Sequence, residues 1–273
     1  MNRVTKAIIP VAGWGTRRLP VTRALEKCMM PIGNRPVIDY VVQDLVMAGI
    51  TDIYFVVNQG DDQLEKFYTR NQRLEEYLQR SGKPEYLRYC ALPQNVNFYY
   101  IEQDSVGKYG TAIPVGLCAP YVKPGESVAV VMGDGFIYRE DGASQAAHLM
   151  TKTPENSCSI LGLNIPREAV SQYGVIEFDD QGRYMQIVEN PAPDQAPSTL
   201  MNTGIYILNY DLLQAIAAYA NVEITGEYRI IEPFSQYTIS GGSMTVVQAE
   251  GEYLDAGDVY TWLYANQRIL GRV

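Results

Sequence analysis

The sequence has few of the side chains that common metal and redox sites need. It contains one histidine, His148, and four cysteines that lie far apart without C-x-x-C spacing. A single imidazole cannot assemble a multi-histidine metal site, and scattered cysteines in a chain of this length do not indicate a disulfide framework. The cysteines are therefore expected to be reduced. The apolar neighbours of His148 indicate an amphipathic helix, and we assign this residue no functional role.

Long apolar runs and an excess of positive charge are also absent. The longest apolar stretches, 7–12 and 127–132, are too short to cross a bilayer, and the N-terminus has no signal-peptide core. The 22 basic and 31 acidic side chains give a formal charge of −9, so no global positive field attracts a nucleic acid. We expect no nucleic-acid or membrane partner, a cytoplasmic location, and phosphate sites that are only local.

The remaining composition is that of a folded protein, with 47% hydrophobic and 19% charged residues. In the N-terminal half, short β-rich runs alternate with helical stretches, which is typical of βαβ crossovers and a mainly parallel sheet. Strands are expected at 7–12, 52–57, 97–102 and 127–132, and helical spacing occurs at 35–48, 62–78 and 112–118. The second half is richer in strands, at 157–164, 174–178, 184–188 and 204–208. With no repeat and no long linker, we predict an α/β fold in a single domain, 1–273.

One acidic residue lies where such folds bind ligands. The valine-rich run 127–132 predicts a central strand buried on both faces, and it ends at Gly133-Asp134-Gly135. In open α/β sheets the ligand crevice lies outside the carboxyl ends of the strands. Asp134 is therefore well placed to hold a metal ion against a substrate.

A glycine-rich segment follows the first predicted strand. Its residues, 13–20, read Gly-Trp-Gly-Thr-Arg-Arg-Leu-Pro. The glycines let successive backbone amides point into one concavity that can hold an anion, and Arg17 adds a fixed positive fork. Lys27 follows closely enough to reach the same phosphates. Taken alone, the glycines could form an ordinary tight turn and Lys27 could be a solvated surface residue.

These residues also carry a resemblance to a known family. The segment 11–31, with V-A-G-W-G-T-R-R-L-P, a downstream lysine and M-P, resembles the nucleotidylyltransferase signature. It continues through 35–42 and 48–53, which are similar to the bacterial UTP–glucose-1-phosphate uridylyltransferases, and runs with gaps to the C-terminus. The resemblance implies a Rossmann-like three-layer nucleotidyltransferase fold. It also implies a nucleotide-binding portion at about 1–135, and a strand-rich sugar-binding portion with a C-terminal helix at about 136–273.

The resemblance assigns roles to individual residues. It implies that the triphosphate is bound by Ala12, Gly13, Gly15, Thr16, Arg17 and Lys27, with Arg17, Lys27 and Asp134 as the catalytic groups. The base would be recognised by Gln103 and Gly110, which the agreement of the neighbouring motifs favours over the alternative of a polar loop that caps a helix. Mg²⁺ would be held by Asp134 and Asp255, and the alternative for Asp255 is a turn residue. The hexose would be bound by Gly174, Glu189, Asn190 and Gly204, which could instead be turn glycines and surface polar groups.

The chain departs from the family pattern at three positions. The family usually has lysine where Asn190 stands, and that lysine binds the sugar phosphate. Replacing it by an amide loses a charge-assisted contact worth roughly 1.5–3 kcal/mol. Arg229 is a conceivable substitute from a neighbouring loop. Glu26 and Cys28 stand where the family usually has proline and glutamate.

The implied reaction transfers a uridylyl group from UTP to glucose 1-phosphate, giving UDP-glucose and pyrophosphate, in a protein that self-associates as family members commonly do. Two rival interpretations remain. One is the same chemistry with dTTP or another sugar 1-phosphate. The other is a non-catalytic regulatory paralogue, which Asn190 favours and the retained carboxylates oppose. A dinucleotide-dependent oxidoreductase is disfavoured because the glycine segment lacks the third glycine and residues 56–58 supply no acidic group for a ribose.

Overall fold

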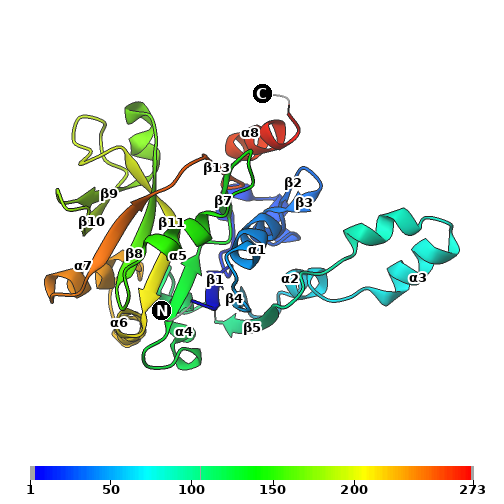
Figure 1. The fold of residues 1–273 in the computed structure, drawn as a ribbon, viewed down its shortest axis with the longest axis horizontal. Helices are drawn as coiled ribbons and strands as arrows, with labels where there is room; N and C mark the ends of the chain where they lie inside the picture. The colour runs from blue at the N-terminus through cyan, green and yellow to red at the C-terminus, as the bar shows by residue number, and fades with distance from the viewer. Residues whose placement is uncertain (1–3, 105, 272–273) are drawn as a thin grey trace.

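The computed structural model of the protein describes residues 4–104 and 106–271. Its centre is a nine-stranded mixed sheet with the order β10-β9-β11-β6-β1-β4-β5, where β8 pairs with both β11 and β12. Strands from both halves of the chain belong to this sheet (Figure 1). The mainly parallel α/β fold predicted from the sequence is therefore confirmed.

The strands of the first half are parallel. They are β1 (Lys6–Pro10), β4 (Asp52–Asn58), β5 (Asn97–Gln103) and β6 (Ser127–Val131). The strands of the second half pair mostly antiparallel, and they are β8 (Cys158–Asn164), β9 (Gly174–Phe178), β10 (Tyr184–Glu189), β11 (Leu200–Asn209) and β12 (Met244–Gln248). The strand expected at 204–208 begins earlier, at Leu200, because its first residues pair with β8.

Helices cover both faces of the sheet and form a three-layer arrangement. The core on one face packs α1 (Val37–Met47), α5 (Gln145–Lys152) and α8 (Val259–Ile269), and the core on the other face packs α4 (Ala112–Leu117), α6 (Tyr210–Asn221) and α7 (Ile231–Ile239). Neighbouring strand residues alternate between the two cores, since Ile8 contributes to one and Ile9 to the other. This alternation is the period of two expected for a strand buried on both faces.

The region with helical spacing at 62–78 forms two helices rather than one. Helix α2 (Gln63–Phe67) ends where the ring of Tyr68 packs against Phe98, with ring centroids 4.4 Å apart. Helix α3 (Gln72–Arg80) starts anew after Asn71, whose side chain accepts a hydrogen bond from the amide of Leu74 at 3.1 Å. Together with the 3₁₀ helix η4 (Pro84–Tyr89), α3 extends away from the sheet (Figure 1).

Two small two-stranded sheets and several 3₁₀ turns complete the described chain. The strands β2 (Pro31–Ile32) and β3 (Arg35–Pro36) pair with each other, which is why the helix expected at 35–48 begins only at Val37. The strands β7 (Gly135–Tyr138) and β13 (Glu252–Asp255) form the second pair. The 3₁₀ turns are η1 (Thr16–Arg18), η2 (Val21–Arg23), η3 (Lys27–Met29), η5 (Ala119–Tyr121) and η6 (Arg167–Gln172).

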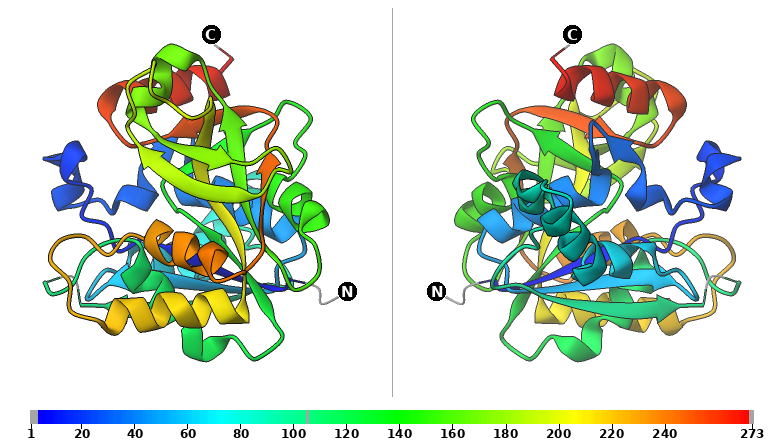
Figure 2. Two further views of the ribbon diagram at one scale, coloured as in Figure 1. Left: turned by 90° about the vertical axis from the view of Figure 1, so that its left-hand side faces the viewer. Right: turned by 90° about the vertical axis from the view of Figure 1, so that its right-hand side faces the viewer.

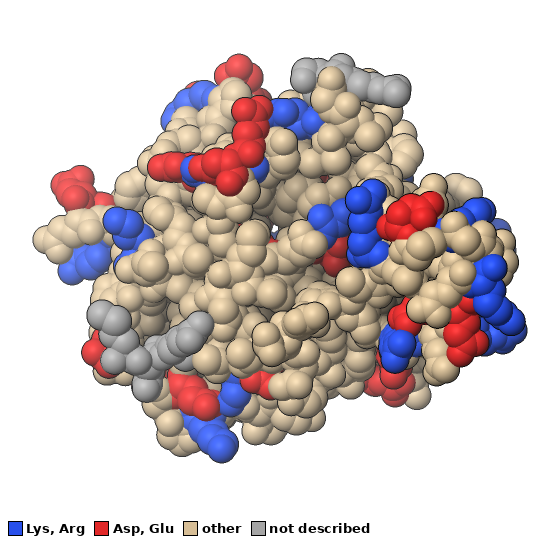
Figure 3. Space-filling view, turned by 45° about the vertical axis from the view of Figure 1, so that its right-hand side comes forward, with Lys and Arg blue, Asp and Glu red and all other residues tan. Residues whose placement is uncertain are grey.

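The remaining expectations concern cysteines, membrane spans and charge. All four cysteines are free thiols. In the described part of the chain, no helix has the length and apolar character needed to cross a membrane. Figure 3 shows lysine and arginine side chains interspersed with acidic ones on the displayed face, with no continuous basic area. This distribution agrees with the absence of a global positive field.

Candidate functional site

A pocket of about 510 Å³ lies at the carboxyl ends of three strands of the sheet. Its lining includes the last residues of β1 and β5, Pro10 and Gln103, and Met132 directly after β6. This is the edge at which open α/β sheets bind ligands. The pocket brings together nine of the residues singled out in the sequence, namely Ala12, Gly13, Gly15, Thr16, Arg17, Lys27, Gln103, Gly110 and Asp134.

The glycine-rich loop is tightly folded at one glycine and open at the other. Gly15 has a left-handed backbone, with φ of 61°, and a Cβ there would lie 2.9 Å from Cγ2 of Thr22. The Thr22 hydroxyl donates a hydrogen bond to the Gly15 carbonyl at 3.0 Å. Apart from Gly13 itself and its two chain neighbours, no heavy atom of the described residues lies within 4 Å of the position that a Cβ would take at Gly13. Gly13 therefore leaves its backbone accessible from the pocket, while Gly15 sets the turn.

Lys27 and Asp134 form an ion pair in the pocket, with Lys27 Nζ donating to Asp134 Oδ2. Lys27 begins η3, and the residue before it is fastened to α2. The amide of Gln63 donates to the Glu26 carboxylate at 2.8 Å, and the amide of Glu26 donates to the Gln63 side chain at 3.2 Å. A proline at 26 would lack this second donor. Glu26, which departs from the family pattern, thus anchors the loop that carries Lys27 to helix α2.

The thiol of Cys28 also lines the pocket, but it is not prepared for chemistry. Its side chain is buried, with 2% of the residue exposed. Burial raises the pKa of this thiol, and the negative charge of Glu26 raises it further. Because the thiolate is the reactive form of cysteine, Cys28 is an inert part of the wall.

The loop between α6 and α7 closes one side of the pocket against the segment before α4. The amide of Tyr228 donates to the Tyr109 carbonyl at 2.9 Å, and the amide of Ala112 donates to the Tyr228 carbonyl at 2.8 Å. Gly110 lies between these bonds with φ of 117°, and a Cβ there would lie 2.5 Å from the Tyr228 carbonyl oxygen. Thr111 makes no side-chain cap for α4, because its hydroxyl accepts from the amide of Ile230 at 3.0 Å. Thr111 thus occupies the N-cap position of α4 without a side-chain cap bond, and the Gly110 carbonyl accepts from the amide of Ile113 at 3.3 Å.

The two acidic candidates lie close together in the backbone, Asp134 directly before β7 and Asp255 at the end of β13. Gly135, which follows Asp134, pairs with Asp255 in the antiparallel β7–β13 pair, and the amide of Ala256 donates to the Asp134 carbonyl at 3.2 Å. Asp255 also stabilises its own turn, since its carboxylate accepts from the Gly257 amide at 2.6 Å. Over the residues described, 4–104 and 106–271, no cluster of three or more His, Cys, Asp or Glu side chains could hold a metal ion. A cation here would thus need further oxygen ligands from a substrate.

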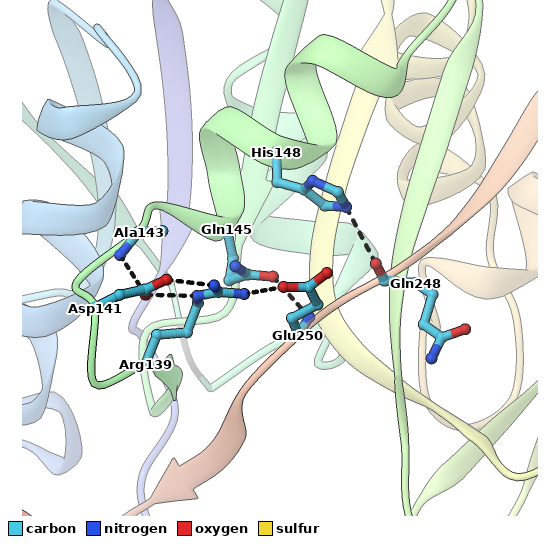
Figure 4. Close-up of polar contacts among 7 residues, drawn as sticks. All are labelled: Arg139, Asp141, Ala143, Gln145, His148, Gln248 and Glu250. Carbon is cyan, nitrogen blue, oxygen red and sulfur yellow. Dashed lines mark hydrogen bonds and ion pairs between the residues drawn. The ribbon is translucent and has the colours of Figure 1, made fainter.

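A charged cluster outside the pocket lies next to the β7–β13 strand pair. Arg139, just after β7, forms ion pairs with Asp141 and with Glu250 of the chain between β12 and β13 (Figure 4). The amide of Glu250 donates to the side chain of Gln145 at 3.1 Å. On the same helix α5, Nε2 of His148 lies 3.2 Å from the carbonyl oxygen of Gln248 (Figure 4). His148 therefore has a structural contact, and its predicted helical location is confirmed.

The predicted sugar-binding residues and Asp255 are not among the residues that line this pocket. Two of them face each other across a hairpin, because Glu189 on β10 pairs with Gly174 on β9. A Cβ at Gly174 would lie 3.1 Å from a carboxylate oxygen of Glu189. Gly204 has φ of 75°, and its carbonyl accepts from the amide of Met132, a pocket residue. Gly204 thus links β11 directly to the pocket wall.

Asn190 directly follows β10 and has a left-handed backbone conformation, with φ of 47°. Its amide donates to the Tyr173 carbonyl at 3.0 Å, and its side-chain nitrogen donates to the Ser171 carbonyl at 3.2 Å. Asparagine is among the few residues that adopt this backbone readily. The departure at this position therefore has a local structural role.

A charged group connects the sugar-binding candidates to the pocket. Burial raises the pKa of Glu189, whereas the positive charge of Arg229 lowers it and the negative charge of Glu227 raises it. Nε of Arg229 lies 3.5 Å from a carboxylate oxygen of Glu227, which lines the pocket. The loop before α7 thus lies next to both Glu189 and the pocket.

Several lining residues were not predicted from the sequence. They are Trp14, Cys28, Tyr109, Thr111, Pro114, Met132, Glu227 and Gly257, among others. Trp14 is 62% exposed and lies inside the G-x-G segment itself, and Tyr109 and Met132 lie within two residues of predicted positions. Adjacency to the motifs could have found these three. No local signal marks Glu227, which only the packing of its loop against Gly110 brings to the pocket.

Comparisons with known proteins extend over nearly the whole chain. The profile of the Nucleotidyl transferase family matches residues 6–272. A Methanocaldococcus jannaschii protein, provisionally named a UTP–glucose-1-phosphate uridylyltransferase, is 34% identical over 277 residues, covering 97% of this chain and 93% of that protein. The Pseudomonas aeruginosa UTP–glucose-1-phosphate uridylyltransferase is 30% identical over 268 residues, covering 96% and 94%. The solved UDP-glucose pyrophosphorylase of Acinetobacter baumannii superposes with a TM-score of 0.86 at 25% identity, covering 97% and 93%.

Proposed function

Because the chain belongs to the Nucleotidyl transferase family, we propose that it transfers a uridylyl group from UTP to glucose 1-phosphate, giving UDP-glucose and pyrophosphate. The observation that carries the proposal is the pocket, which combines an accessible glycine-rich loop, two cations and a carboxylate at the carboxyl edge of the sheet. The relatives similar over nearly their full length bear the name of this activity. The proposed substrates are intracellular metabolites, so the proposal places the reaction in the cytoplasm.

The chemistry requires positioning and charge neutralisation more than proton transfer. A phosphate oxygen of glucose 1-phosphate attacks the α-phosphorus of UTP, the bond from that phosphorus to the bridging oxygen breaks, and pyrophosphate leaves. The nucleophile is already anionic, so no protein base is needed. Arg17 and Lys27 would stabilise charge on the triphosphate, and the open backbone at Gly13 would donate amides to its oxygens. Ala12, Gly15 and Thr16 complete this cradle.

Mg²⁺ is the cofactor that fits the donor set of the site. Asp134, directly before β7, and Asp255, on the paired strand β13, would supply carboxylate oxygens, and Mg²⁺ is held in proteins by one or two carboxylates together with substrate phosphates. We propose that these two residues hold the ion. When bound, it would neutralise phosphate charge.

The remaining residues are assigned to the base and to the hexose. We propose that Gln103 and Gly110 contact the base and that Gly174, Glu189, Asn190 and Gly204 surround the hexose. Glu189 would accept hydrogen bonds from sugar hydroxyls. Self-association of the chain is part of the same proposal, by analogy with the family.

The test is pyrophosphate release by the purified protein with Mg²⁺. UTP, dTTP, GTP, CTP and ATP are each offered with glucose 1-phosphate and with other hexose 1-phosphates. Release with UTP and glucose 1-phosphate as the preferred pair is the expected result. Preference for dTTP or another sugar would keep the mechanism and overturn the specificity. Nucleotide binding without release from any pair would overturn catalysis and favour the regulatory paralogue.

A further inference from the structure

The sugar end of the site contains two carboxylates and one guanidinium. Arg229 contacts Glu227 at 3.5 Å, and the charges of these two residues both act on Glu189, where Arg229 lowers the pKa and Glu227 raises it. In the part of the chain that the structure describes, the cations that line the pocket itself are Arg17 and Lys27, and Lys27 is ion-paired with Asp134. A hexose 1-phosphate brings a charge of about −1.5 to −2. Two acidic groups alone would repel it.

We propose that Arg229 binds the phosphate of the hexose 1-phosphate and thereby makes the site selective for a phosphorylated sugar. The inference rests on the proposed function, because it assigns a residue to the second substrate of that reaction. Asn190, the neighbour of Glu189, is uncharged and donates its side-chain amide to the Ser171 carbonyl. Arg229 therefore supplies the positive charge that this end otherwise lacks.

The guanidinium is available for a ligand. The Arg229 side chain is 48% exposed, and its contact with Glu227 is long, at 3.5 Å, with the Glu227 side chain 43% exposed as well. An ion pair between two exposed groups contributes little stability. A phosphate presents oxygens that match the planar fork of an arginine and bind it bidentately. Exchange of the carboxylate for a phosphate is therefore favourable.

The backbone that carries Arg229 is fixed. The neighbouring Tyr228 is buried, its amide and carbonyl bond to the segment before α4, and its hydroxyl donates to the Val222 carbonyl at 2.8 Å. The same packing requires glycine at 110. The blue segment after β1 and the orange loop before α7 lie on the same side of the molecule (Figure 2). The backbone next to Arg229 is thus held in place by the hydrogen bonds and burial of Tyr228.

The test separates the two substrates. Arg229→Gln and Arg229→Lys are compared with Arg183→Gln, a control on the β9–β10 hairpin whose arginine pairs with Asp179 and is 63% exposed. For Arg229→Gln we expect the KM for glucose 1-phosphate to rise about tenfold or more, since a charge-assisted hydrogen bond is lost. The KM for UTP should stay within about twofold. Arg229→Lys should be intermediate, and Arg183→Gln should match the wild type.

Rescue provides a second measurement. Adding Asn190→Lys to Arg229→Gln places an ammonium beside Glu189, and we expect the KM for glucose 1-phosphate to fall back toward the wild-type value. A purely structural role for Arg229 would not allow this recovery. Unchanged KM for glucose 1-phosphate in Arg229→Gln, or equal increases for both substrates, would overturn the inference.

Binding without turnover distinguishes this inference from the proposed function. Glucose 1-phosphate should raise the melting temperature of the wild type more than that of Arg229→Gln, and unphosphorylated glucose should show no such difference. If the wild type releases no pyrophosphate but still shows this difference, the proposed function fails and the phosphate site stands. If the wild type is active and the difference is absent, only the role of Arg229 fails. Should Arg229→Gln not fold, the same comparison is made with Arg229→Lys.

Discussion

Lys27 and Asp134, 107 positions apart in the sequence, form an ion pair inside the pocket at the carboxyl edge of the sheet. The Lys27 side chain is 15% exposed and that of Asp134 is 41% exposed. The lysine therefore neutralises a carboxylate that remains accessible from the pocket. If Asp134 holds Mg²⁺ as proposed, the ion would compete with Lys27 for the Asp134 carboxylate. Lys27 could then pair with the phosphate oxygens of the substrate.

The first prediction concerns Asp134→Asn. The change removes the negative charge proposed to hold Mg²⁺ and leaves the shape of the side chain nearly unchanged. We expect pyrophosphate release to fall by about a hundredfold or more, as for loss of one preorganised electrostatic group. Circular dichroism and the melting temperature should stay near the wild type. Asp180→Asn, at an exposed acidic residue, is the matched control and should retain full activity. Near-normal release by Asp134→Asn would contradict the metal assignment.

The second prediction concerns Gly110→Ala. The backbone has φ of 117°, and the added methyl group would lie 2.5 Å from the Tyr228 carbonyl oxygen. Strain and overpacking together should lower the free energy of unfolding by about 2 kcal/mol or more. Displacement of the loop should also raise the KM for UTP.

Gly142→Ala is the control for this change. Gly142 has φ of 68° and no heavy atom within 4 Å of a Cβ, so only the left-handed backbone is penalised, by about 1 kcal/mol. Chemical denaturation compares the two variants. An equal effect at both glycines would show that the Gly110 loop can move without cost.

Much of the fold follows from local sequence patterns. The strand at 174–178 was predicted with its observed bounds, and the valine-rich strand before Asp134 extends to Val131. The strand before Asp134 is predictable because a strand buried on both faces is nearly continuously apolar, and the strand at 174–178 is predictable from its short β-rich run between turn residues. The glycine-rich loop was predictable for a related reason, since its turn residues follow a strand directly.

Features that depend on distant contacts could not be predicted. The start of β11 at Leu200 depends on its pairing with β8, and the placement of Glu227 depends on the contact of its loop with Gly110. The pairing of Asp255 with Gly135 was not predicted, because residues 120 positions apart share no local pattern; the resemblance implied only that Asp134 and Asp255 hold one ion. Strand pairing and packing between segments far apart in the chain produce no local sequence pattern from which they could be predicted.

The third prediction concerns a buried arginine next to Arg17. Arg18 is 5% exposed and lies over the ring of Trp262, 5.2 Å from its centroid. Among residues 4–104 and 106–271, none accepts a hydrogen bond from its Nε or Nη1. Unpaired buried donors cost about 1–3 kcal/mol, and the contact with the ring offsets about 0.5–1 kcal/mol. Arg18→Met should therefore raise the free energy of unfolding by about 1 kcal/mol.

Chemical denaturation measures this change, with Arg23→Met as the control. Arg23 is exposed in the same segment, and its replacement should alter stability by no more than about 0.5 kcal/mol. Destabilisation by Arg18→Met would show that packing of the arginine stem or a substrate-bound acceptor outweighs the unpaired donors. A loss of activity without loss of stability would instead identify Arg18 as a phosphate-binding group.

The fourth prediction concerns the pH dependence that Glu189 should impose. Burial raises the pKa of this carboxyl, the charge of Arg229 lowers it, and that of Glu227 raises it. The net pKa is above the ordinary value, so the group takes up a proton at a higher pH than most glutamates. The protonated form accepts hydrogen bonds less well, and the KM for glucose 1-phosphate should rise as the pH falls through this pKa.

Variants identify the group responsible for this acid limb. The phosphate of the substrate also titrates, near pH 6, so each profile is compared with that of the wild type under the same conditions. Glu189→Gln should remove the part of the rise that belongs to Glu189. Arg229→Gln should shift that part to higher pH, because the charge that lowers the pKa is gone, and Glu227→Gln should shift it to lower pH. Shifts of the same sign in these two variants would show that Glu189 is not the titrating residue.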